Sequence, residues 1–163
     1  MNWYKISKLN IETKIKNIFK THPLFINLLK EYNIDKEDID NKLDIKIKEL
    51  DGQFSIANSK VIYLDPKIID NLFEENFHFV THEFFHWIKR RHEKEFYFND
   101  PEETQCFVLA AVWELMDGKN INDIKKKIFP IINNILKDKQ KSEIFFNKII
   151  KYALDIKELF KNV

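Results

Sequence analysis

Glycine is almost absent from this chain of 163 residues, which contains only Gly52 and Gly118. Glycine-rich phosphate loops and dinucleotide-binding turns need several glycines within a few residues, so both kinds of nucleotide site are excluded. Cysteine is scarcer still, with Cys106 alone. A single cysteine excludes an internal disulfide and any cysteine-rich zinc module, and it is typical of a protein in a reducing compartment.

An excess of charge of one sign and long hydrophobic runs are also lacking. The chain has 27 basic and 26 acidic side chains and a formal net charge of +1, which does not favour a nucleic-acid partner. No stretch approaches the roughly 18 uncharged apolar residues that span a bilayer. No apolar run of the secretory-signal type follows the first ten residues. We therefore expect a cytoplasmic protein with neither a nucleic-acid nor a membrane partner.

The chain does have enough apolar residues, 44% of the total, to form the core of one ordinary domain. Helical spacing of these residues dominates the first 40 positions, with a new helix starting around 21–23. Alternating spacing over 43–47, followed by runs at 53–57 and 61–64, predicts three antiparallel strands joined by tight turns. Helices follow from about residue 70 onward, with breaks near 99–101, 117–118, 130 and 138.

These patterns predict an α+β fold in which a small antiparallel three-stranded sheet packs on several helices. We expect a single domain, 1–163. It would comprise a helical N-terminal part (1–42), a core that contains the sheet (43–116) and C-terminal helices (117–163).

One motif carries chemistry, and it reads His82, Glu83, Phe84, Phe85, His86. On a helix His82 and His86 lie one turn apart on the same face, so both imidazoles can point at one metal ion. Glu83 lies about 100° around the helix from His82, where it can reach a metal-bound water without binding the metal. This is the spacing of the helix in zinc metallopeptidases.

The surrounding residues favour a metal site over a chance spacing of histidines. At the helical period, the large apolar residues fall on one arc, and these are Phe77, Val80, Phe84, Phe85, Trp87 and Ile88. His78, His82, Glu83 and His86 fall on the opposite arc. The apolar arc would hold the helix to the core while the candidate ligands point away from it. The simpler alternative is a helix whose histidines merely happen to lie four residues apart.

With this motif the chain resembles the zinc-dependent metallopeptidases of the zincin type. Over about residues 43–116, the order of sheet, motif helix and following helix is similar to that of small cytoplasmic gluzincins, including the minigluzincins and the ImmA/IrrE-type peptidases. The resemblance implies a zincin-like fold with helical N- and C-terminal extensions. It also implies one Zn²⁺ ion bound by His82, His86 and a glutamate of the helix that follows the motif helix.

Three glutamates of that helix are candidates for the third ligand. Glu103 shares a helical face with Phe107, Ala110 and Ala111, so packing of this face would bring it to the motif helix, and we prefer it. Glu102 and Glu114 remain alternatives, and Glu114 could instead orient a ligand histidine. Cys106 could approach the metal, but a lone cysteine in such a helix is more often a small buried hydrophobe.

The expected activity is that of a zinc-dependent endopeptidase acting on a peptide or protein substrate. Zinc would polarise the scissile carbonyl, and Glu83 would take a proton from the metal-bound water and pass it to the leaving amine. The substrate would pair with 61–64 as an edge strand. Tyr97, His92 and His78 are candidate transition-state stabilisers.

A rival interpretation keeps the zinc site but not the catalysis. In it the chain is a regulatory or binding module of zincin fold, or a latent enzyme, that binds zinc without detectable proteolysis. The long helical segments outside 43–116 would then recognise a partner protein or cover the cleft. The sequence names neither the substrate nor the oligomeric state.

Overall fold

The computed structural model describes residues 3–91 and 101–161, with the backbone alone for residues 3–9 and 161. It is an α+β protein with a small three-stranded sheet, as the sequence predicts. The chain forms two compact units, residues 1–95 and 96–163. The predicted core, 43–116, therefore includes parts of both units, with the histidine motif in the first and the candidate glutamates in the second.

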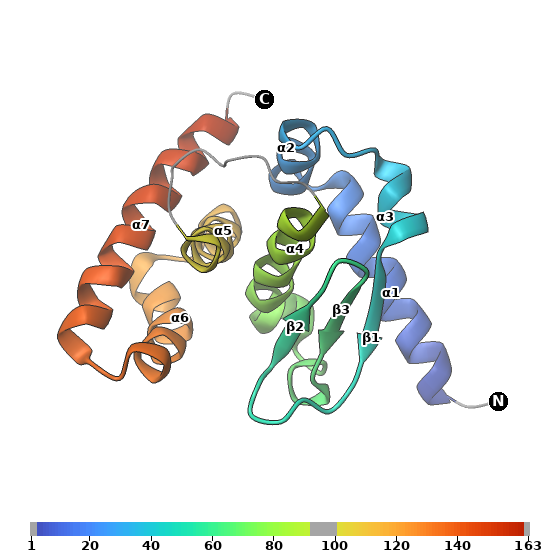
Figure 1. Cartoon of the computed structure of the whole chain (residues 1–163), viewed down its shortest axis with the longest axis horizontal. Coiled ribbons are helices and arrows are strands. Elements are labelled where there is room, and N and C mark those ends of the chain that lie inside the picture. The colour runs from blue at the N-terminus through green and yellow to red at the C-terminus, as the bar shows by residue number, and fades with distance from the viewer. Residues whose placement is uncertain (1–2, 92–100, 162–163) are drawn as a thin grey trace. The chain divides into compact units, whose positions relative to one another are not determined.

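The first unit holds the sheet and the helices that surround it (Figure 1). In chain order its elements are α1 (Trp3–Thr21), α2 (Pro23–Glu31), α3 (Lys36–Lys42), β1 (Asp44–Ile47), β2 (Ser55–Ala57), β3 (Val61–Leu64), the 3-10 turn η1 (Pro66–Ile68), the π-helical turn η2 (Leu72–Asn76) and α4 (Phe77–Arg91). The predicted helix start at 21–23 is confirmed. Pro23 opens α2, and the His22 ring accepts a hydrogen bond from the Leu24 amide.

The sheet is mixed, so the prediction of three antiparallel strands is wrong for one of its two pairs. β2 pairs antiparallel with β3, but β1 pairs parallel with β3, and the order across the sheet is β1-β3-β2. The cause lies in residues 48–54, which connect β1 to β2. They form no tight turn back along β1 but run past the end of β3. The Lys48 amide donates to the Leu64 carbonyl, and the Leu50 amide donates to the Asp65 carboxylate. β3 is therefore the central strand.

Four phenylalanines form the centre of the first unit's core and join α1, α2 and α4. The ring centroid of Phe84 lies 4.0 Å from that of Phe19 and 5.2 Å from that of Phe25, and Phe77 lies beside both of these rings. Each of the four side chains is at most 1% exposed. Full burial of one phenylalanine contributes about 1.5–3 kcal/mol. This cluster therefore fixes α4, which carries the histidine motif, against the two N-terminal helices.

The second unit contains three helices and no strand in its described residues, and these helices are α5 (Glu102–Met116), α6 (Ile121–Leu136) and α7 (Lys139–Lys161). α7 packs on both α5 and α6. The break expected near Pro130 is absent, because α6 continues through this proline. Ile124, Ile128 and Ile132 form one buried face on both sides of it, and their burial offsets the hydrogen bond that a proline cannot donate. In residues 3–91 and 101–161, no helix combines the length and the apolar character needed to cross a membrane.

Candidate metal centre

The motif helix α4 buries the apolar face that the sequence predicts, but the predicted ligand face is only partly open, because His78 and Glu83 are also buried. Its apolar residues are all buried, and these are Phe77, Val80, Phe84, Phe85, Trp87 and Ile88. His82 and His86 are only half-buried. Arg91, at the end of α4, donates to the Ser59 carbonyl and so ties the helix to the turn between β2 and β3. The helix is therefore anchored along its apolar side, and the two histidines lie on its other face.

The imidazoles of His82 and His86 lie side by side, as their spacing in the sequence predicts. Their ring centroids are 5.0 Å apart, and the two ring nitrogens that could bind a metal lie within 4.8 Å of each other. Two nitrogens bound to one tetrahedral zinc at about 2.0–2.1 Å are about 3.4 Å apart. Side-chain rotations that move the ring nitrogens by on the order of 1 Å would bring them to that distance. The pair therefore fits two ligand positions of a zinc ion.

Glu83 lies between the two histidines in the sequence and is 6% exposed. Its Oε1 accepts a hydrogen bond of 2.8 Å from the hydroxyl of Ser55 in β2. Ser55 was not predictable from the sequence, because it lies 28 residues before Glu83 and no local pattern joins them. A correct strand order would have been the one available signal, since it brings β2 to the sheet edge beside α4.

The strand expected to bind substrate is not at an edge of the sheet. Val61–Leu64 forms β3, which is paired on both sides, so the expectation of substrate pairing along 61–64 is wrong. The two edge strands are β1 and β2. The misplacement follows from the strand order, because the sequence pattern does not reveal that β3 inserts between β1 and β2.

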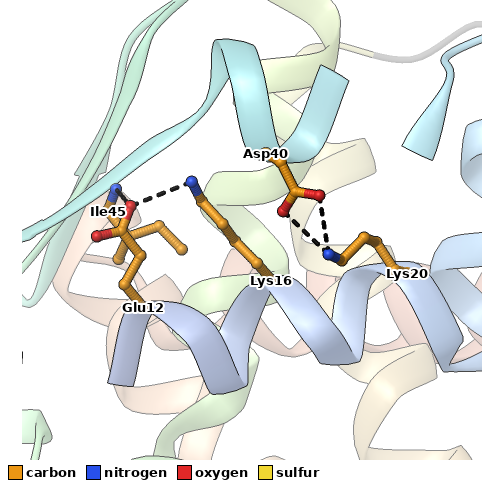
Figure 2. A network of polar contacts seen from close by, with 5 residues as sticks. All are labelled: Glu12, Lys16, Lys20, Asp40 and Ile45. Atoms are coloured by element: carbon orange, nitrogen blue, oxygen red, sulfur yellow. Dashed lines mark hydrogen bonds and ion pairs between the residues drawn. The ribbon is translucent and has the colours of Figure 1, made fainter. Parts of the chain in front are cut away.

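The outer edge of β1 is covered by α1 (Figure 2). Glu12 of α1 accepts a hydrogen bond of 3.3 Å from the Ile45 amide, which points away from β3, and it also pairs with Lys16 at 3.2 Å. Next to this pair, Lys20 of α1 binds Asp40 of α3. A side chain that satisfies an edge amide makes further strand pairing there unfavourable. Further pairing is thus unfavourable along the β1 edge.

The candidate third ligands all belong to the second unit. In the first turn of α5, Glu103 is exposed and Glu102 is half-buried. Glu114 is 2% exposed, and its carboxylate lies 3.2 Å from the Lys127 ammonium of α6. That ion pair offsets the cost of burying the Glu114 charge within its own unit. Cys106 is buried in α5. Zinc binding by Glu103 stays a prediction.

The candidate transition-state stabilisers are distributed differently. His78 lies one turn before His82 on α4 and is 4% exposed, with its ring centroid 4.2 Å from that of Phe79. His92 and Tyr97 lie outside the described residues.

Comparisons of the chain with protein-family models, with curated proteins and with solved structures found no match. The resemblance to zincins therefore rests on the histidine motif and on the order of the elements around it.

Proposed function

We propose that this protein is a zinc-dependent metallopeptidase that hydrolyses internal peptide bonds. The observation that carries the proposal is the pair of adjacent, half-buried imidazoles of His82 and His86, together with the buried carboxylate of Glu83 on the same helix. Two imidazoles and one further ligand make a zinc site that keeps a position for water, as in hydrolytic enzymes. The single cysteine favours a reducing compartment, so the proposed location is the cytoplasm.

His82, His86 and one acidic residue of α5, preferably Glu103, would hold the metal. When bound, zinc polarises the scissile carbonyl and makes water a stronger acid. Glu83 supplies the base: its carboxylate takes a proton from the attacking water and then gives a proton to the nitrogen of the leaving amine. One carboxylate can do both because the two transfers occur at different stages of the same hydrolysis.

An extended peptide would reach these residues along the outer edge of β2. Phe54 accepts from the Asp65 amide, and the Asn58 amide donates to Val61, so these alternate residues direct their main-chain groups at β3. In an antiparallel pair the residues between them direct their main-chain groups outward. Ser55 and Ala57 would therefore bind the peptide backbone, which favours acceptance of several sequences.

Glu83→Gln tests the proposed activity. Glutamine has nearly the same size and can still accept the Ser55 hydrogen bond, but it cannot take up the proton of water. We expect the zinc-loaded parent to cleave an unstructured protein substrate, and we expect the variant to keep its zinc and lose at least about 100-fold in kcat. Cleavage by the variant at the parent rate would contradict the role of Glu83. Zinc binding by a parent that cleaves no peptide would favour the binding module or the latent enzyme.

A further inference from the structure

The hydroxyl of Ser55 joins the sheet to the motif helix. Its Oγ donates to Oε1 of Glu83 at 2.8 Å, and Glu83 is 6% exposed. Hydrogen bonds to a charged carboxylate are about twice as strong as those between neutral groups, and low exposure limits competition by water. Ser55 therefore restricts the orientation of the one carboxylate in the histidine motif.

Restriction matters for this side chain because glutamate has three rotatable torsions. A carboxylate that samples several rotamers spends little time at the position from which it can take a proton, and rates fall steeply with misplacement of about 1 Å. A donor on a strand is a fixed reference point, since the β2 backbone is held by its pairing with β3. The hydrogen bond would thus confine the base before any substrate arrives.

The backbone of Ser55 also lies on the outer edge of the sheet. Its main-chain groups face away from β3, whereas the neighbouring Phe54 is bonded to Asp65. Side chains alternate along a strand, so Ser55 and the buried Ala57 face α4 while Ile56, 39% exposed, faces away from it. One residue therefore presents its backbone to the outer edge of the sheet and its hydroxyl to Glu83.

We propose that Ser55 is a positioning residue that sets the Glu83 carboxylate in register with a peptide bound along β2. The inference rests on the proposed peptidase function. The backbone of Ser55 binds the peptide, and its side chain holds the base, so the distance between the scissile bond and the base is set by a single residue.

The hydrogen bond can be tested without metal or substrate. In the metal-free full chain we expect Ser55→Ala to lower the midpoint of thermal unfolding by about 2–4 °C, because it leaves a buried carboxylate without its donor. The same substitution in a Glu83→Ala background should shift the midpoint by less than about 1 °C. Equal shifts in the two backgrounds would show that the two side chains do not interact and would overturn the proposal.

The positioning role is tested by steady-state kinetics of the zinc-loaded protein. Ser55→Ala should lower kcat by at least about 10-fold with KM within about twofold and with zinc content unchanged. Ser55→Thr keeps a hydroxyl and a residue suited to strands, so it should restore kcat to within about threefold of the parent. Ser59→Ala, in the turn that follows β2, is the matched control and should cleave like the parent.

A Ser55→Ala variant with the parent kcat would overturn this inference alone and leave the peptidase proposal intact. The same holds for a Ser55→Thr variant as slow as Ser55→Ala, because the rescue by a hydroxyl would then fail. A zinc-loaded parent without cleavage would overturn the peptidase proposal and with it the positioning role. The unfolding experiment would in that case still report whether the hydrogen bond stabilises the fold.

Discussion

The buried carboxylates of the first unit are each held by a specific donor. Glu83 accepts from the Ser55 hydroxyl, and Asp65 accepts from the amides of Leu50 and Lys67. Burial of a carboxylate without such donors costs several kcal/mol, so these bonds decide where the two side chains can lie. At Glu83 the donor orients a candidate base. At Asp65 the donors tie the segment after β1 to the end of β3.

The Asp65 carboxylate should stabilise the fold at pH values above the range in which an aspartate ordinarily titrates. The Leu50 amide, followed by the Lys67 amide, lowers the pKa of the Asp65 carboxyl, because both donors favour its charged form. A group whose pKa is lowered by folding contributes stability above its unfolded pKa, and this contribution is lost as the pH falls through the folded value. The stabilisation is thus present at neutral pH and declines below about pH 4.

We predict that Asp65→Asn lowers the midpoint of thermal unfolding at pH 7 by several degrees, because the amide directs hydrogens toward one of the two donors. The difference from the parent should shrink as the pH is lowered from about 4. Asp51→Asn, an exposed position in the same segment, is the matched control and should change the midpoint little. Equal effects of the two substitutions at pH 7 would contradict the anchoring role of Asp65.

The strands and helices differ in how well the sequence predicts them. The helix start at Pro23, the strand at 61–64 and the helix end at Asp117 depend on neighbouring residues, and all three are confirmed. The parallel pairing of β1 with β3 is accompanied by a bond from the Leu50 amide to Asp65, which lies 15 positions further along the chain. A short-range pattern contains no information about that bond, so the strand order could not be predicted.

The mixed sheet leaves two edges of different character. Glu12 bonds the outward amide of Ile45 and so covers the β1 edge, whereas the β2 edge lies beside the motif helix. Natural sheets commonly cover or charge the edges that must not pair. In the proposed function an incoming peptide would therefore pair with β2, the strand that carries Ser55, the donor to Glu83.

Peptide pairing along β2 predicts an alternating effect of backbone methylation. The amides of an extended peptide point by turns toward and away from the strand that it binds. Two isomers of one peptide can therefore be compared, each N-methylated at one of the two alternating sets of amides. Methylation of the set that faces β2 should raise KM at least about 10-fold, and methylation of the other set should change KM little. The unmethylated peptide serves as reference. Similar KM values for both isomers would contradict pairing along this edge.

The division of the chain into two units determines what the sequence could establish about the site. His82 and His86 lie four residues apart on one helix, so their adjacency was predictable, and the 5.0 Å between their ring centroids confirms it. Glu83 lies on the same helix but is buried, with its carboxylate bonded to Ser55. Ser55 was not predictable, because strand pairing brings it to the helix. The choice among Glu102, Glu103 and Glu114 depends on how a residue of the second unit meets the motif helix, which no local pattern specifies.

We predict that Glu103 is the third zinc ligand. Glu103→Ala should weaken zinc binding at least about 100-fold, because it removes a charged ligand, whereas Glu102→Ala should change the affinity by less than about threefold. Competition with a chromophoric chelator measures both. Glu114→Gln and Cys106→Ser complete the set, compared at equal folded fraction because Glu114 also pairs with Lys127. A larger loss of zinc affinity from Glu102→Ala, Glu114→Gln or Cys106→Ser than from Glu103→Ala would show that another residue is the third ligand.

The zinc content of the purified chain tests the central claim most directly. Elemental analysis should find about one zinc per chain in the parent and in His22→Asn, a matched control that removes an imidazole distant in sequence from the motif and retains a residue suited to cap α2. The double substitution His82→Ala and His86→Ala should leave a folded protein with less than about a tenth of that zinc. Full zinc content in the double variant, or none in the parent after zinc is supplied, would contradict a metal centre on α4.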